Sequence, residues 1–305
     1  MQTKVVIGTR RSKLALKQTA MVAEMLKAKF PTLSVEIKEI VTEGDRNLKD
    51  SLVNLGGKGV FVKEIEQELL DGSIDMAVHS LKDVMPVLPP DLTLGAFPKR
   101  ANPFDCLITR DPYESLQKLP LHAKIGTNSV RRASQLLAQR PDLEIIPIRG
   151  NVETRLNKLT TENLTGVVLA WAGLQRLQLD LHAYHLLDLR EVIVPAVGQG
   201  IMAIECRRDN AVVGELLAAI DDAEARQCAQ LERDFMRELG GNCTFPIGGY
   251  ARYEKDELLF TGVIASPDGK HVLKEEAKHA NGHGVGAKVA DQLLAADIYG
   301  IIEGK

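Results

Sequence analysis

The sequence predicts an α/β protein with two doubly wound lobes and a smaller α+β domain at its C-terminal end. Three observations lead to this expectation. The chain has 305 residues, which is enough for two or three domains. A strand, turn, helix and strand near the N-terminus recur in the same order in the middle of the chain. After about residue 217 the hydrophobic pattern changes to one helix followed by short strands.

The first copy of the repeat begins with a β-branched strand at residues 5–7, followed by a Gly-Thr turn and apolar residues at helical spacing. The second copy opens in the same way at residues 124–129 and continues into a helix over 131–139. In both copies a proline and a leucine precede the next strand, at residues 35–37 and 144–146. We therefore expect two βαβ units of the same plan, one in each lobe.

Two later segments, residues 75–78 and 166–170, are nearly continuous in apolar residues, as buried strands of a parallel sheet are. The third domain begins with a helix whose apolar face carries Ala225, Cys228, Leu231, Phe235 and Leu239. Strands near 257–260 and 271–273 and a last helix near 285–296 follow. We place lobe 1 at 1–99 with 197–216, lobe 2 at 100–196, and the third domain at 217–305.

The charge balance gives no general attraction to nucleic acids or anionic membranes, because 38 Lys and Arg face 41 Asp and Glu. The sequence lacks both the apolar stretch of a secretory signal and the ~18 apolar residues of a membrane span. Its four cysteines have neither metal-site spacing nor the density of a disulfide scaffold. We expect a cytoplasmic protein that binds neither nucleic acid nor membrane.

One cysteine differs from the others by its position. Cys106, Cys206 and Cys228 lie in predicted strands or on an apolar helix face, where a small buried thiol is usual. Cys243 lies in the loop GGNCTFP at 240–246, between a glycine helix stop and a proline. Cys243 is therefore the candidate for a reactive or modified thiol, and a structural role remains the alternative.

The polar segment HSLKD at 79–83 follows directly on a predicted strand. Polar groups at the carboxyl ends of parallel strands stand where α/β proteins bind ligands. Asp83 is the main candidate, and an aspartate that only starts a helix is the alternative. His79 and Asp83 are four residues apart, but no third ligand is near them in the sequence, so we predict no metal site. The glycine segment 56–59 lacks the spacing of a phosphate loop and does not indicate nucleotide binding.

Several arginines lie near predicted strand ends or helix starts. Guanidinium groups bind carboxylates through two parallel hydrogen bonds, and helix N-termini add N–H donors. A single surface arginine is usually solvated, but this number in similar positions indicates a small ligand with several negative charges. These residues are Arg10, Arg11, Arg131, Arg132, Arg149, Arg155 and Arg176.

Eight motifs in order along nearly the whole chain resemble the hydroxymethylbilane synthase (porphobilinogen deaminase) family of the tetrapyrrole pathway. They are IGTRRSKLALKQ (7–18), GGKGVFVKEIE (56–66), AVHSLKDV (77–84), GTNSVRRASQ (126–135), IRGNVETRL (148–156), VLAWAGLQRL (168–177), VPAVGQG (194–200) and GGNCTFPIGG (240–249). Each motif alone is weak, and the eight together are specific.

The resemblance implies two lobes like type II periplasmic binding proteins and a third domain, 217–305, that carries a covalently bound dipyrromethane cofactor. Cys243 matches the attachment cysteine, and Asp83 matches the catalytic aspartate. The residues that match cofactor-binding positions are Lys82, Ser129, Arg131, Arg132 and Arg155. The residues that match substrate-binding positions are Arg10, Ser12, Arg149, Arg155 and Arg176. Arg11 matches no functional position.

The family implies a monomeric transferase of heme and porphyrin biosynthesis, which joins four porphobilinogen molecules with loss of ammonia and releases the linear tetrapyrrole hydroxymethylbilane. Loss of ammonia creates a cationic azafulvene, and a buried carboxylate at Asp83 would stabilise it. The chain departs from the usual pattern at Met85, where proline is frequent, and at Gly240-Gly241-Asn242, where Glu-Gly-Gly is frequent. The alternative is a non-enzymatic, two-lobed protein that binds a small polyanion and carries no covalent adduct.

Overall fold

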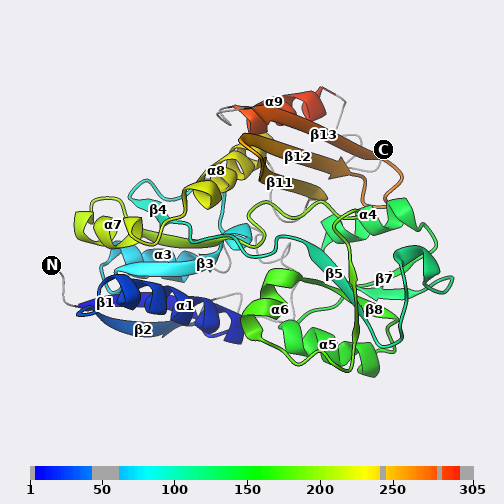
Figure 1. Ribbon diagram of the computed structural model, residues 1–305, viewed down its shortest axis with the longest axis horizontal. Helices are drawn as coiled ribbons and strands as arrows, with labels where there is room; N and C mark the ends of the chain where they lie inside the picture. Colours follow the sequence, from blue (N-terminus) through cyan, green and yellow to red (C-terminus); the bar gives the residue numbers. More distant parts are fainter. Residues whose placement is uncertain (1–3, 43–61, 241–244, 280–283, 296–305) are drawn as a thin grey trace. The chain divides into compact units, whose positions relative to one another are not determined.

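The computed structural model describes residues 4–42, 62–240, 245–279 and 284–295 (Figure 1). The chain divides into two compact units. Unit 1 contains Met1–Ala101 and Ile201–Gln230, and unit 2 contains Asn102–Gly200 and Leu231–Lys305. The glycine segment 56–59 lies outside the described residues.

Unit 1 is built on a five-stranded mixed sheet with the order β2-β1-β3-β10-β4. The strands are β1 (Lys4–Arg10), β2 (Ser34–Ile40), β3 (Met76–Ser80), β4 (Leu92–Ala96) and β10 (Met202–Arg207). β1 is parallel to β2 and β3, whereas β10 is antiparallel to both of its neighbours. A strand from late in the chain therefore completes the first sheet.

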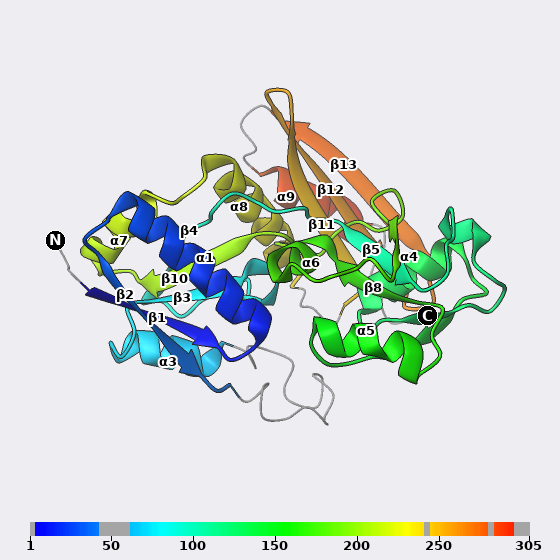
Figure 2. The same ribbon diagram turned by 60° about the horizontal axis from the view of Figure 1, so that its bottom comes forward.

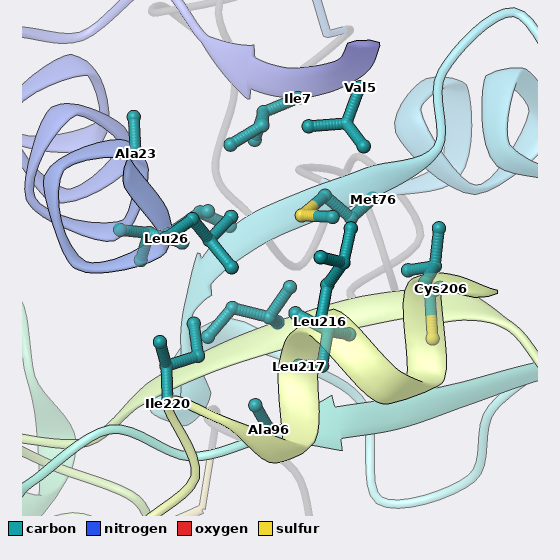
Figure 3. Close-up of a cluster of buried hydrophobic side chains, with 14 of the residues drawn as sticks. Val5, Ile7, Ala23, Leu26, Met76, Ala96, Cys206, Leu216, Leu217 and Ile220 are labelled. Carbon is teal, nitrogen blue, oxygen red and sulfur yellow. The ribbon is translucent and has the colours of Figure 1, made fainter. Parts of the chain in front are cut away.

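Helices cover both faces of this sheet (Figure 2). α1 (Lys13–Lys29) and α7 (Ala211–Ala218) pack on one face. There Val5, Leu26, Met76 and Leu217 form part of a buried apolar cluster (Figure 3). α3 (Lys63–Leu70) packs on the other face through Ile65 and Leu69. Because strand side chains alternate, the two faces of β3 and β10 meet different helices.

Unit 2 contains a second five-stranded sheet with the order β7-β6-β8-β5-β9. Its strands are β5 (Asp105–Thr109), β6 (Lys124–Gly126), β7 (Glu144–Ile146), β8 (Gly166–Ala170) and β9 (His185–Asp188). Here β5 is the antiparallel strand. α4 (Val130–Gln139) packs on one face, and α5 (Val152–Thr161) and α6 (Trp171–Leu177) pack on the other.

The two sheets have the same plan, which confirms the predicted repeat. β1, α1 and β2 of unit 1 correspond to β6, α4 and β7 of unit 2, and the antiparallel strand takes the fourth place in each sheet. The segments 75–78 and 166–170, whose apolar runs indicated buried strands of a parallel sheet, form β3 and β8 of mixed sheets. β3 and β8 each pair with a parallel strand on one side and an antiparallel strand on the other.

A third, antiparallel sheet belongs to the C-terminal part of the chain. It has the order β11-β12-β13, with β11 at Ile247–Glu254, β12 at Glu257–Ala265 and β13 at Val272–His279. α8 (Ala223–Glu238) and α9 (Val285–Leu294) accompany it, and Phe235 of α8 packs on Phe260 of β12 with 4.9 Å between ring centroids. The predicted apolar face of α8 is buried along its length. Within the described residues, no helix has the length and apolar character of a membrane span.

Candidate active site

A pocket of about 60 Å³ lies in unit 1 at the ends of β1 and β3. It brings together three residues that the sequence predicted as site residues, Arg10, Ser12 and Asp83. Arg10 is the last residue of β1, and Asp83 is the last residue of the short helix η1 (Leu81–Asp83), which directly follows β3. The ends of neighbouring parallel strands thus place a guanidinium and a carboxylate at one pocket.

The backbone holds η1 in place at both of its ends. Leu81 N donates to the carbonyl oxygen of Ile201 at 3.0 Å, and Val84 N donates to Leu81 O at 3.0 Å. Val84 then adopts an extended conformation, with φ −87° and ψ 133°, so the chain leaves the helix before Met85. Asp83 and Lys82 are exposed, and the expectation of a buried Asp83 carboxylate was therefore wrong for this structure.

Ser12 has a structural role that the motif comparison does not reveal. Its Oγ accepts a hydrogen bond from Ala15 N at 3.2 Å and caps the N-terminus of α1. Ser129 occupies the corresponding place in unit 2, where its Oγ accepts from Arg132 N at 3.4 Å and caps α4. Serine satisfies one of the free N–H groups at a helix start, which explains why both helices begin at these points.

The pocket in unit 1 also contains polar residues that the sequence reasoning did not assign. Gln18 Nε2 donates to Ser80 Oγ at 3.0 Å, which joins α1 to the end of β3. His79 lines the pocket and lies 3.0 Å from Glu205 Oε2 through its Nε2. The sequence analysis considered His79 only as a metal ligand. Its position near the end of a predicted strand was the feature that could have placed it at a pocket.

Two arginines of unit 2 share one buried carboxylate. Asp105 Oδ2 accepts from Arg131 Nη2 at 2.9 Å, and Asp105 Oδ1 accepts from Arg132 Nη2 at 2.7 Å and from Arg132 Nε at 3.1 Å. All three side chains are at most 7% exposed. Burial lowers the pKa of Arg131, and the charge of Asp105 opposes this shift. Two positive charges and one negative charge leave this cluster with a net charge of about +1.

A tight turn at the end of the VPAVGQG motif contacts the same cluster. Gln199 Nε2 donates to Asp105 Oδ1 at 2.9 Å and to the carbonyl oxygen of Pro103 at 2.7 Å. Gly198 and Gly200 have φ values of 74° and 86°, a conformation that favours glycine. Sequence reasoning missed Asp105 and Gln199, because Asp105 lies in an apolar strand and its partners are far away in the sequence.

Arg176 is buried, and its charge is only partly satisfied. Its Nη2 donates to Gly200 O at 2.7 Å, while its Nε is buried without a hydrogen-bond partner within the described residues. Burial lowers the pKa of Arg176 to about 10. A buried guanidinium with an unused donor is costly unless an anion satisfies it. Arg176 is therefore suited to bind a carboxylate.

The remaining predicted residues of unit 2 are half-buried. Arg155 on α5 donates from Nε to Gly150 O at 2.9 Å. Arg149 lies three residues beyond β7, which ends at Ile146. Arg11 is exposed and lies 3.9 Å from Glu39, as its lack of a functional match suggested.

Cys243 lies outside the described residues, so its geometry stays a prediction. The other three cysteines are buried, as expected from their strands and helix face. The described part of the chain contains no group of three His, Cys, Asp or Glu side chains suited to a metal ion.

Two α/β sheets of the same plan, a carboxylate pocket in one unit and buried guanidinium groups in the other define a class of α/β protein suited to small anionic ligands. Comparison with known proteins identifies the family. The model "Porphobilinogen deaminase, dipyromethane cofactor binding domain" matches residues 5–215, and "Porphobilinogen deaminase, C-terminal domain" matches residues 226–295.

Curated relatives agree with the family models. The chain is 59% identical over 305 residues to a porphobilinogen deaminase of Limosilactobacillus reuteri, with 100% of both chains covered. It is 47% identical over 290 residues to that of Brevibacillus brevis, covering 95% of this chain and 93% of the relative. The chain belongs to the porphobilinogen deaminase family, whose members are also called hydroxymethylbilane synthases.

Among solved structures, the BenM effector binding domain with its effector benzoate aligns at 13% identity and a TM-score of 0.43, over 71% of this chain and 90% of that one. The assignment to the α/β class rests on the strand orders of the sheets. The family assignment favours the enzymatic interpretation over a non-enzymatic polyanion-binding protein.

Proposed function

We propose that this chain joins four porphobilinogen molecules, with loss of ammonia, into hydroxymethylbilane on a dipyrromethane cofactor attached to Cys243. The observation that carries this proposal is the set of buried guanidinium groups in unit 2, above all Arg176 with its unused Nε donor. Porphobilinogen brings two carboxylates per pyrrole ring, and guanidinium groups are the side chains best suited to bind them. We further propose that the protein acts as a cytoplasmic monomer without nucleic acid or membrane partners.

The residues of unit 2 fit a cofactor that carries carboxylates. The Arg131 and Arg132 cluster retains a net positive charge of about +1 after pairing with Asp105. Ser129 and Arg155 of unit 2 and Lys82 of unit 1 complete the proposed cofactor-binding set. When bound, dipyrromethane anchors the growing chain and supplies the pyrrole carbon to which the first substrate is joined.

Substrate binding is assigned to Arg10, Ser12, Arg149, Arg155 and Arg176. Arg10 and Ser12 share the unit 1 pocket with Asp83, which supports a common ligand for the three residues. In this proposal, Asp83 stabilises positive charge as the aminomethyl group of the substrate loses ammonia and accepts a proton after the new bond forms. An exposed carboxylate at a pocket is accessible for both tasks.

The domain boundaries are part of the same proposal. Lobe 1 comprises 1–99 with 197–216, lobe 2 comprises 100–196, and 217–305 forms the cofactor-attachment domain. The third sheet lies entirely within this last segment, together with α8 and α9.

The intact mass of the purified protein tests the proposal. We expect an adduct of two linked pyrrole units on the wild type and none on Cys243→Ser, because a hydroxyl is a much poorer nucleophile than a thiolate. Cys228→Ser is the matched control, since Cys228 is buried on α8, and its adduct should persist. A wild type without an adduct, or an adduct that persists in Cys243→Ser, would contradict the assignment.

The intact mass also tests the roles proposed for four arginines, because it shows which variants still carry the cofactor adduct. Arg131→Leu and Arg132→Leu should impair cofactor assembly, whereas Arg149→Leu and Arg176→Leu should keep the adduct and weaken substrate binding. Each lost charge pair, if buried, costs about 2–5 kcal/mol through the carboxylate left unpaired. Four variants with full adduct and wild-type kinetics would refute these roles.

A further inference from the structure

A buried histidine and glutamate lie beside the unit 1 pocket, and the roles assigned above do not use them. His79 Nε2 lies 3.0 Å from Glu205 Oε2, and the two side chains are 4% and 0% exposed. His79 also lines the pocket that contains Asp83. The pair therefore connects the candidate site of unit 1 with the interior of its sheet.

The pair lies on the sheet face that α3 covers. β3 and β10 are antiparallel neighbours, with His79 opposite Ala203 and Glu205 opposite Ala77. The residues that alternate with them along both strands belong to the apolar cluster on the α1 face. His79 and Glu205 consequently share the opposite face, where Glu66 of α3 is half-buried.

A purely structural ion pair does not explain this arrangement. Glu205 Oε1 is buried and has no hydrogen-bond partner within the described part of the chain. Buried pairs offset their desolvation only when their remaining polar atoms are satisfied, and apolar side chains of similar volume are often at least as stabilising. Glu205 Oε1 is therefore an unused hydrogen-bond acceptor on the carboxylate that contacts the imidazole.

Glu66 of α3 is a second carboxyl group that interacts with the His79 and Glu205 pair. Burial raises the pKa of Glu66, the negative charge of Glu205 raises it further, and His79 opposes the rise. The other charged residues on these elements and at the pocket are Lys63, Glu64 and Glu68 on α3, Asp75 before β3, Arg207 on β10, and Arg10 and Asp83 at the pocket. His79 and Glu205 thus share a desolvated space with a third ionisable side chain, Glu66.

We propose that His79 and Glu205 form a proton store for Asp83. The inference rests on the proposed condensation of porphobilinogen. In each condensation the C–N bond of the aminomethyl group breaks, its electron pair leaves with nitrogen as ammonia, and a new C–C bond forms. The pyrrole carbon that made this bond by attacking the methylene carbon then loses its proton to Asp83. His79 takes this proton from Asp83 and shares it with Glu205, and its return to ammonia as ammonium restores the pair.

The test compares single-turnover rates of porphobilinogen consumption from about pH 6 to about pH 9. His79→Gln and Glu205→Gln keep the size and much of the hydrogen bonding but cannot hold the proton in the same way. We expect each rate to fall about tenfold or more, with an altered pH profile and little change in KM. Added imidazole should partly restore the rate of His79→Ala, which a lost structural contact would not do.

Thr19→Val is the control, because it removes the hydrogen bond from the buried residue Thr19 to Ala15 O in the same unit without changing the pair. Its rate should stay within about twofold of the wild type. Circular dichroism and an intact mass first confirm that each variant is folded and loaded. Rates of His79→Gln and Glu205→Gln within about twofold of the wild type at every pH would overturn the inference. If one variant fails to fold, the other decides.

The two proposals fail in different ways. A wild type that forms no tetrapyrrole would contradict the proposed function. A wild type that forms tetrapyrrole, with His79 and Glu205 variants that match it, would contradict the proton store alone.

Discussion

Replacing Asp105 by asparagine should destabilise unit 2, because one carboxylate neutralises part of the charge of two buried guanidinium groups. Asp105 accepts three hydrogen bonds from Arg131 and Arg132 and one from Gln199, at distances of 2.7 to 3.1 Å. Asparagine retains a single acceptor oxygen, and its NH₂ group faces guanidinium donors. Removal of one partner from a buried charge pair costs about 3–5 kcal/mol, and we expect a loss in this range.

Urea denaturation of the wild type and Asp105→Asn measures this loss, and the midpoint of thermal unfolding should fall on the order of 10 °C. Asp188→Asn is the matched control in the same unit. Asp188 accepts from Arg190 Nη2 at 2.6 Å, but this pair is exposed, with 35% and 51% of the two side chains accessible. An exposed pair contributes about 0–1 kcal/mol. If Asp105→Asn loses no more stability than Asp188→Asn, the shared carboxylate does not hold the arginine pair.

Three further predictions concern the rest of the molecule. Asp83→Asn should fold normally, because the Asp83 side chain is exposed. On protein whose cofactor is confirmed by mass, its single-turnover rate should fall by a factor of about 10²–10³, and a rate near that of the wild type would exclude the proposed role. Burial raises the pKa of Cys106 to about 12 and that of Cys206 to about 11, so iodoacetamide at about pH 8 should label neither in the folded protein and both in urea, as read by mass spectrometry. The Arg140 guanidinium lowers the pKa of Asp142, so Asp142→Asn should reduce the free energy of unfolding above about pH 4. The difference in stability between wild type and variant should disappear as the pH falls through the lowered pKa of Asp142. A difference in stability that is equal at every pH would contradict the pairing.

The repeat could be predicted because its signals are local. The Ile-Gly-Thr sequence at each turn, the helical spacing after it and the proline before the next strand are all found within a short window of the sequence. The places of β5 and β10 could not be predicted in this way. Both strands are apolar, and their antiparallel pairing depends on partners distant in the sequence, with Ala203 pairing with His79 and Leu107 with Val168.

The candidate site shows the same division. Arg10 and Asp83 were found because they lie at or shortly after the carboxyl end of a strand, and neighbouring parallel strands bring such ends to one edge of a sheet. Asp105 gave no comparable signal. Asp105 begins a fully buried strand, and its role as the partner of two arginines depends on α4, which places Arg131 and Arg132 against it.

The partners of each arginine determine how it acts on a ligand, because the number of guanidinium groups does not equal the net positive charge at the binding site. Arg131 and Arg132 carry two charges, but Asp105 holds both groups and removes one charge from the total. Arg176 has no carboxylate partner within the described residues, and burial alone lowers its pKa to about 10. The free-energy cost of burying the Arg176 guanidinium is already present in the protein without a ligand, and a ligand carboxylate that pairs with Arg176 offsets this cost. A carboxylate that reaches Arg131 and Arg132 instead competes with Asp105 for the same N–H donors. Arg176 is thus best suited to strengthen binding, and the Asp105 cluster to fix orientation, because its donors are already held in a defined geometry.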